Sequence, residues 1–145
     1  MKNFLFATVL LIALTTSAFA DPTNVSSTTL WNFHSEFKNA SNVTWLVEKE
    51  FTKATFTLND KKLTAFYTLT GDIIGTSTNI TLDDLPINAK RIFAKKFDGF
   101  TVLEAIRFEG VDEGAYYISA ENEKHVVILK VSDHSQVSIF KKTKK

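Results

Sequence analysis

The three histidines are the residues whose spacing best tests for metal chemistry. They are His34, His125 and His134. A helical zinc site places two histidines four residues apart with a glutamate beside them, and no pair here has that spacing. His134 follows Asp133 in an expected turn, where short polar residues are typical. The sequence therefore predicts no metal site.

Nucleophilic and acid–base catalysis also lack their usual patterns. The sequence has no Gly-x-Ser-x-Gly turn for a nucleophilic serine, and its five glycines form no phosphate-binding loop. Asp83 and Asp84 are adjacent carboxylates at the start of an expected helix, where they would cap it and favour its dipole. The other candidate carboxylates lie on expected strands near turns, where a solvated face is typical: Glu48, Glu50, Glu104 and Glu109. We predict no catalytic residues, no cofactor and no enzymatic activity.

The first twenty residues have the pattern of a secretory signal peptide. Lys2 precedes an apolar run over 4–14, and Ala18 and Ala20 are small residues at positions −3 and −1 of a cleavage after Ala20. The run is short for a membrane span. The sequence predicts an exported protein, periplasmic or secreted, with no stable membrane anchor after cleavage.

Composition narrows the class of partner. The 145 residues carry 17 Lys+Arg and 16 Asp+Glu, a formal net charge of +1, which argues against a nucleic-acid-binding surface. The sequence has no cysteine, so disulfides and thiolate ligands are excluded. Lys141, Lys142, Lys144 and Lys145 follow the last expected strand as a basic tail. Such a tail could touch an anionic surface but is typical of a solubilising terminus.

Hydrophobic periodicity predicts the same order of elements twice. A period near 3.6 predicts helices over 30–39 and 85–97, the second with Pro86 in its first turn. Alternation with period two predicts four strands after each helix. The expected strands are 43–47, 51–58, 63–69, 73–78, 101–108, 115–120, 124–131 and 137–140.

The two halves superpose residue by residue. Phe33 and Phe37 match Phe93 and Phe97 at an offset of 60. Strand residues match at offsets of 61 and then 62: Trp45, Ala54 and Phe56 with Ile106, Ala115 and Tyr117, and Ala65, Tyr67 and Leu69 with Val127, Leu129 and Val131. We predict two tandem α-β4 repeats, about 28–80 and 82–141, that form a single domain over 21–145. The expected fold is α+β, an antiparallel sheet with helices packed on one face.

These patterns resemble the PepSY-like, beta-lactamase-inhibitor-like family of exported bacterial proteins of the Bacteroidetes type. The motif residues are Phe37, then Asn42-Val43-Thr44-Trp45, Phe51-x-x-Ala54-x-Phe56, Ala65-x-Tyr67, Gly71, Ile73, Asp84-Leu85-Pro86 and Phe97-Asp98-Gly99-Phe100. The resemblance implies a fold similar to beta-lactamase inhibitory protein, in which a concave sheet face grips the target enzyme. That inhibitor is held together by disulfides, which this sequence lacks, so the resemblance implies the fold more than the inhibition.

The face of the sheet away from the helices is the candidate binding surface. If Ala54, Phe56, Ala115 and Tyr117 face the helices, their neighbours face outward. In the first half these neighbours are mostly threonines, as on a wet sheet. Apolar and aromatic residues in such positions are typical of interfaces. The predicted binding residues are Phe66, Tyr116, Ile118, Val126 and Ile128. There are two alternatives to a binding surface. The alternation in the second half could be shifted by one residue, or a dimer partner could cover the patch.

We therefore expect a non-enzymatic exported binding module whose partner is an envelope or extracellular protein. It could be an inhibitor of a peptidase or beta-lactamase. The alternative is a cell-envelope accessory or structural protein that forms a homodimer through the same face. We further expect Trp45 on the helix-facing side with Phe37 and Phe56 nearby. We also expect that neither half folds alone, because about sixty residues bury too little surface without a disulfide or metal.

Overall fold

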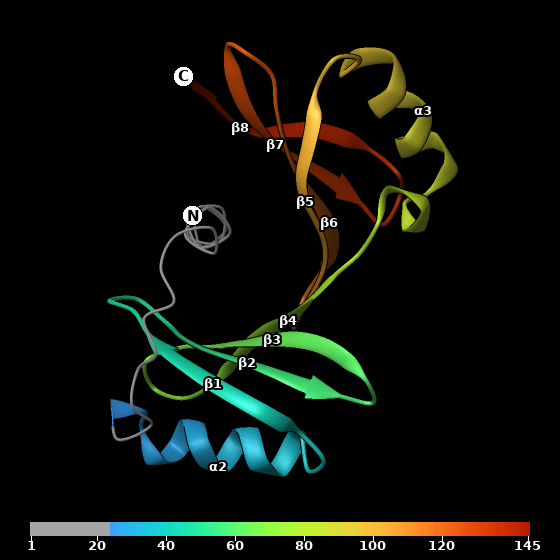
Figure 1. Ribbon diagram of the computed structural model, residues 1–145. Coiled ribbons are helices and arrows are strands. Elements are labelled where there is room, and N and C mark those ends of the chain that lie inside the picture. Colours follow the sequence, from blue (N-terminus) through green and yellow to red (C-terminus); the bar gives the residue numbers. More distant parts are fainter. Residues whose placement is uncertain (1–23) are drawn as a thin grey trace. The chain divides into compact units, whose positions relative to one another are not determined.

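The computed structural model describes residues 24–145, which divide into two compact units (Figure 1). Within the described residues, the N-terminal unit comprises 24–79 together with 108–113. The C-terminal unit comprises 80–107 and 114–145. The predicted signal peptide and its cleavage after Ala20 lie outside the described residues. The eight strands follow their sequence order from β1 to β8 in one sheet, and the fold is α+β with two α-helices among the described residues.

In the N-terminal unit, a helix packs on one face of a meander of short strands. Its helix, α2, begins after Ser26, whose Oγ accepts a hydrogen bond of 3.1 Å from the Thr29 N–H, as an N-cap should. Asn59 and Asp60 both have positive φ, as the two central residues of a tight hairpin turn require. The elements are α2 (Ser27–Glu36), β1 (Ser41–Val47), β2 (Thr52–Leu58), β3 (Lys61–Tyr67) and β4 (Ile73–Asn79).

Aromatic rings make up most of the N-terminal core. Phe33 of α2 has no exposed surface, and its ring centroid lies 5.0 Å from those of both Trp45 and Phe56. Phe37 lies 4.7 Å from Phe56 in the same cluster. Trp45 therefore faces the helix with Phe37 and Phe56 nearby, and this part of the prediction is confirmed.

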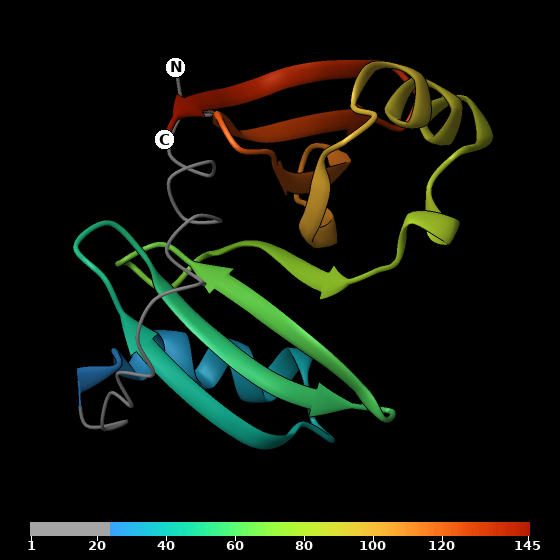
Figure 2. The same cartoon turned by 45° about the horizontal axis from the view of Figure 1, so that its top comes forward.

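The second unit repeats the arrangement of helix and strands. Its elements are η3 (Leu82–Asp84), α3 (Ile87–Lys96), β5 (Thr101–Gly110), β6 (Gly114–Glu121), β7 (His125–Ser132) and β8 (Val137–Lys144). The end of β5, from Phe108, belongs to the N-terminal unit. β6 and β7 pair antiparallel, as do β7 and β8, which run side by side in both views (Figures 1 and 2). Because β8 continues to Lys144, three of the four lysines predicted as a basic tail are part of a strand.

The start of the second helix differs from the prediction. Asp83 and Asp84 lie in the short η3, and Pro86 is the N-cap of α3. Asp84 instead accepts hydrogen bonds from the Thr81 N–H at 2.8 Å and the Thr81 hydroxyl at 2.9 Å. These bonds, with the charge of Lys90, hold the pKa of Asp84 below its usual value. Asp84 therefore caps η3, one turn earlier than expected.

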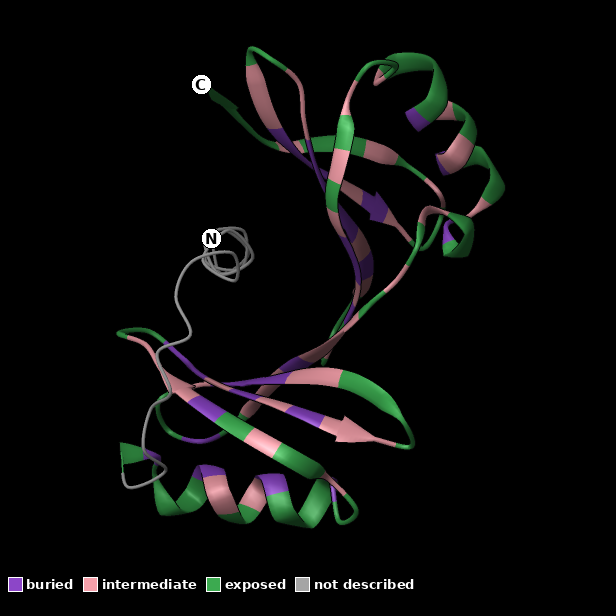
Figure 3. Ribbon diagram, viewed as in Figure 1, coloured by how far each residue is buried: buried purple, intermediate pink, exposed green. Residues whose placement is uncertain are grey.

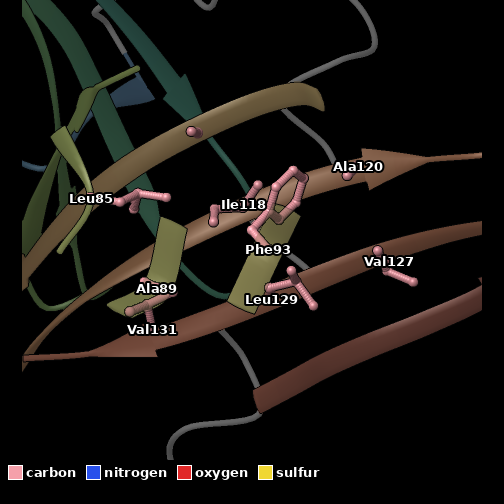
Figure 4. Packing of buried hydrophobic residues seen from close by; sticks show 9 residues of the cluster. Leu85, Ala89, Phe93, Ile118, Ala120, Val127, Leu129 and Val131 are labelled. Carbon is pink, nitrogen blue, oxygen red and sulfur yellow. The ribbon is translucent and has the colours of Figure 1, made fainter. Parts of the chain in front are cut away.

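Aliphatic side chains dominate the C-terminal core. Leu85, Ala89 and Phe93 pack onto residues of β6 and β7 on one face of the sheet (Figure 4). The sheet contributes Ala105, Ile118, Ala120, Val127, Leu129 and Val131. Tyr116 lies against the same cluster, partly buried. This face of the C-terminal unit is therefore the face covered by its helix.

The structure corrects the predicted alternation in β6. Tyr116 pairs with Val131 and Ile118 pairs with Leu129. Cross-strand partners lie on the same face, so Tyr116 and Ile118 face α3 rather than the open side. The offset of 61 used for β6 differs by one residue from the match that the structure shows, and a slip of one residue moves every matched strand residue to the opposite face. An offset of 62 matches Ala54 and Phe56 to Tyr116 and Ile118, which all face a helix.

Candidate functional site

The structure separates the five predicted binding residues into two groups. Phe66, Val126 and Ile128 lie on sheet faces opposite the helices. Tyr116 and Ile118 do not: Ile118 is only 1% exposed and packs beneath α3 (Figure 4). Residues 115–118 are Ala-Tyr-Tyr-Ile, so no alternation of polar and apolar residues reveals which of them face inward.

Arg107 explains why Tyr116 can lie on the helix side although it is partly exposed. The Arg107 guanidinium carbon lies 4.6 Å from the centroid of the Tyr116 ring, a cation–π contact. The same guanidinium forms a salt bridge with Asp133 in the turn between β7 and β8. Tyr116 is therefore held at the margin of the core by a charged residue of β5.

The C-terminal open face is the surface of β6–β8 opposite α3. Its centre is formed by Tyr117, Ser119 and Ile128. The neighbours of each along the strand face the helix, so the residue itself faces the opposite side. Val126 lies beside Glu121 on the same face. Phe140 joins it from a bulge in β8, with its ring edge-on to Tyr117 at 5.6 Å. We use the name C-terminal open face for these residues: Tyr117, Ser119, Val126, Ile128 and Phe140.

Burial on this face decreases toward the β8 side. Tyr117, Ser119 and Ile128 are buried, and Ile128 is only 2% exposed. Val126 and Phe140 are half-buried, and the neighbouring Lys141 is exposed (Figure 3). Val126, Phe140 and Lys141 are therefore the side chains that a partner could contact without unpacking the centre.

One polar atom lies in the centre of the face without a hydrogen bond. The Ser119 Oγ is buried and has no hydrogen-bond partner. Its cross-strand neighbour is Ile128, whose side chain can offer none. A buried hydroxyl in this state has lost hydration without compensation. Ser119 therefore offers a donor and an acceptor to any group that docks over it.

Basic residues border the apolar centre. Lys130 pairs with Ser138 and Tyr117, and Lys141 pairs with Ile128, so both lysines lie on the open-face side of their strands. Glu121 contributes the opposing charge and binds the Lys145 ammonium at 2.8 Å. This surface thus combines apolar residues with a positively charged border.

In the N-terminal unit, the open face carries a row of three rings. Phe66 of β3 lies 6.2 Å from both Phe51 and Phe108, measured between ring centroids. Gly75, the cross-strand partner of Phe66, leaves space for Phe108: a Cβ there would lie 2.6 Å from that ring. All three phenylalanines are buried, and Thr55 and Thr64 beside them are linked through their hydroxyls at 3.3 Å. The row is therefore a packed cluster rather than an accessible patch.

The sequence prediction missed Tyr117, Ser119 and Phe140 on the C-terminal face and Phe51 and Phe108 on the N-terminal one. Correct alternation in β6 alone would have identified Tyr117 and Ser119. Phe140 could not be found this way, because a bulge changes the alternation within β8.

A second buried hydroxyl lies in the N-terminal core. Tyr67 has no exposed surface, and its Oη has no hydrogen-bond partner. Burial raises the pKa of the Tyr67 phenol well above its usual range, and the nearby charge of Glu36 raises it further. The phenol is therefore neutral, and it lies under α2 rather than on a surface.

The described part of the chain contains no group of three or more His, Asp or Glu side chains placed to hold a metal ion. Within it, no helix combines the length and the apolar character needed to cross a membrane.

Comparison with known proteins identifies the fold. Solved structures from Bacteroides superpose on this chain over most of its length. A BLIP-like protein from Bacteroides fragilis superposes with a TM-score of 0.68 at 14% identity, covering 88% of this chain and 89% of that chain. A DUF2874 family protein from Bacteroides ovatus superposes with a TM-score of 0.72 at 15% identity, covering 86% and 89%.

A third solved structure shares the fold. A protein assigned to the periplasm of Bacteroides eggerthii superposes with a TM-score of 0.72 at 14% identity, covering 83% of this chain and 88% of that chain. No protein-family profile and no curated protein matches the sequence. At these identities the likeness shows the fold alone.

Proposed function

We propose that this chain is a non-enzymatic, periplasmic binding module that captures a protein partner through its C-terminal open face. The observation that carries the proposal is the gathering of Tyr117, Val126, Ile128 and Phe140 on the face opposite α3. Aromatic and aliphatic side chains with a charged border are typical of protein interfaces. The export leader, cleaved after Ala20, belongs to the same proposal.

The finer assignment of family is also part of the proposal. We infer a PepSY-like member of the beta-lactamase-inhibitor-like family built from two tandem α-β4 repeats. Two observations support it. The order of one helix and four strands occurs twice, and Phe33 and Phe93 occupy equivalent buried positions in α2 and α3. Phe37 and Phe97 are the C-caps of the two helices. Each donates its backbone N–H to the carbonyl oxygen of the phenylalanine four residues earlier, Phe33 or Phe93.

Inhibition of a peptidase or beta-lactamase is one form that this binding could take. The BLIP-like name of the Bacteroides fragilis structure supports testing such enzymes first as partners. The alternative is a homodimer that covers the same face, in an accessory or structural role. Partner capture and homodimer formation would both place Val126 and Phe140 in the interface. One pair of variants therefore tests the face, and a measurement of oligomeric state then separates the two functions.

The test uses opposite faces of β8. Phe140→Glu changes the open face, whereas Ile139→Glu changes the other face of the strand, where Ile139 is 55% exposed. Each mature variant is used as bait in a periplasmic extract, after a thermal melt has shown that it folds. We expect Phe140→Glu to lose the partner retained by the wild type and Ile139→Glu. Equal capture by both variants would remove the C-terminal open face from consideration.

Sedimentation then distinguishes capture from self-association. A wild-type chain that is monomeric at micromolar concentration supports a different protein as the partner. A dimer that Phe140→Glu dissociates and Ile139→Glu preserves would support the homodimer instead. Turnover of a substrate that survives repurification would contradict the non-enzymatic part of the proposal.

A further inference from the structure

The outer edge of β8 is a second surface that the open face does not use. β8 lies at the end of the strand order and, among the described residues, pairs only with β7. An edge strand presents unpaired N–H and C=O groups along its outer side. From Lys141 to Lys145 every residue is exposed (Figure 3). The backbone of this segment is therefore accessible to another strand.

The accessible segment carries a dense positive charge. Its sequence is Lys-Lys-Thr-Lys-Lys, and β8 contains no acidic residue. Lys145 binds Glu121 at 2.8 Å, whereas Lys141, Lys142 and Lys144 form no salt bridge with any described residue. Three ammonium groups thus remain available along four residues of edge strand.

The register distributes these charges over both faces of the edge. Lys142 and Lys144 pair with Val127 and His125, while Lys141 and Thr143 pair with Ile128 and Val126. Each strand added beside β8 would therefore meet an ammonium group on either face. The bulge at Phe140 ends this regular segment on its N-terminal side.

Charge decides which strand can be added. A second copy of β8 in antiparallel pairing would place Lys141 opposite Lys144, and like charges directly opposite each other are unfavourable. Lysines on edge strands commonly prevent such self-pairing. An extended segment with Glu or Asp at alternate positions would instead place carboxylates opposite Lys142 and Lys144, which share one face of the edge.

We propose that the edge of β8 at Lys141–Lys144 binds an acidic peptide segment as an added β-strand. Backbone hydrogen bonds would supply affinity, as in other cases of strand addition, and the three lysines would select acidic side chains. This proposal concerns the edge rather than the open face, so it stands or fails separately from the binding function proposed above.

The experiment measures binding of a capped, fluorescent peptide Glu-Thr-Glu-Val-Glu-Thr-Glu to the whole mature chain. A peptide with Lys in place of each Glu controls for charge. A peptide of the same charge, N-methylated at alternate residues, controls for backbone pairing because it lacks those hydrogen-bond donors. We expect the unmodified acidic peptide to bind at least about tenfold more tightly than either control, with amide shifts in NMR spectra confined to residues 125–128 and 139–145.

Matched charge reversals locate the site on the protein. The variant Lys141→Glu, Lys142→Glu, Lys144→Glu should lose binding by about tenfold or more. The variant Lys38→Glu, Lys61→Glu, Lys62→Glu changes the net charge equally at exposed positions of the N-terminal unit and should bind as the wild type does. Both variants are first checked by thermal melting. Loss of binding in Phe140→Glu alone would assign the peptide to the open face and overturn the proposal.

Three other results would also overturn it. Equal binding of the N-methylated peptide would show simple polyanion attraction without strand pairing. Tighter binding to vesicles with anionic lipid than to the peptide would show a membrane-surface role for the lysines. No detectable peptide binding at low salt, where charge attraction is least screened, would show that the lysines only protect the edge.

Discussion

The two units use the same order of elements but different cores. The N-terminal core stacks Phe33, Phe37, Trp45 and Phe56, whereas the C-terminal core packs Leu85, Ile118 and other aliphatic residues beneath α3. Ring contacts are specific in geometry, and small aliphatic residues adapt more easily to a neighbour's change. The difference shows that one architecture can be stabilised by mainly aromatic or by mainly aliphatic packing. It also leads us to expect different sensitivities to mutation.

The largest expected effect comes from cutting the chain. A fragment 21–80 lacks Phe108–Glu113, which completes the N-terminal unit through the Val111 N–H to Ile74 carbonyl bond of 3.3 Å and the contact of Phe108 with Phe66. We expect no cooperative thermal transition for this fragment by circular dichroism, because a chain of that length buries only about 60% of its surface. Fragment 21–113 retains these contacts and should melt cooperatively. A cooperative melt of 21–80 would contradict the role of the β5 end.

Core truncations compare the two units directly. Phe33→Ala should cost about 3–5 kcal/mol of unfolding free energy, because the ring has no exposed surface and contacts three other aromatic rings of the N-terminal core. Leu129→Ala at an equally buried position of the C-terminal core should cost about 2–5 kcal/mol. Urea denaturation of both variants measures the difference. A larger loss of unfolding free energy for Leu129→Ala than for Phe33→Ala would contradict the expectation that the aromatic core is the more sensitive one.

Gly75 of β4 tests how closely the N-terminal unit packs against the end of β5. A Cβ at this position would lie 2.5 Å from the Glu109 carbonyl oxygen and 2.6 Å from the Phe108 ring. Gly75→Ala should therefore destabilise the protein by about 1–3 kcal/mol, since backbone cannot move aside as a side chain can. Gly99→Ala is the contrasting variant, because nothing lies within 4 Å there although its φ of +79° is strained for alanine. Denaturant midpoints that rank Gly99→Ala well below Gly75→Ala would contradict the steric argument.

The smallest expected effect concerns the unpaired hydroxyl of the aromatic core. Tyr67→Phe removes a buried Oη without a partner, so stability at neutral pH should change little or rise by up to about 1 kcal/mol. The raised pKa means that the folded state holds its proton above pH 10.0, where the unfolded chain loses it. Stability should therefore fall as pH rises above 10.0 in the wild type and fall less in Tyr67→Phe. Urea titrations at neutral and alkaline pH measure both effects, with Tyr116→Phe at the partly exposed tyrosine as the control.

Periodicity predicted most of the fold because both helices have one apolar stripe. Phe33, Phe37 and Trp45 could be assigned to a core from spacing alone, and the structure places them there. β6 could not be assigned in the same way, since Ala115 to Ala120 is apolar on both faces apart from Ser119. The candidate face depends on that alternation, so two of its five predicted residues, Tyr116 and Ile118, were placed on the wrong side. Lys141–Lys144 was missed as a strand because lysine has a low strand propensity, which pairing with β7 overrides.

The division of β5 between the two units has a consequence for the order in which the protein can form. In the proposed export from the N-terminus, residues 24–79 cross the membrane before 108–113, so Gly75 of β4 stays uncovered until the later segment follows. In that interval the N-terminal unit is incomplete, because it lacks residues 108–113. Chaperones, proteases and neighbouring chains all act on such waiting intermediates. The arrival of residues 108–113, rather than the strength of either core, therefore sets when the first half is protected from them.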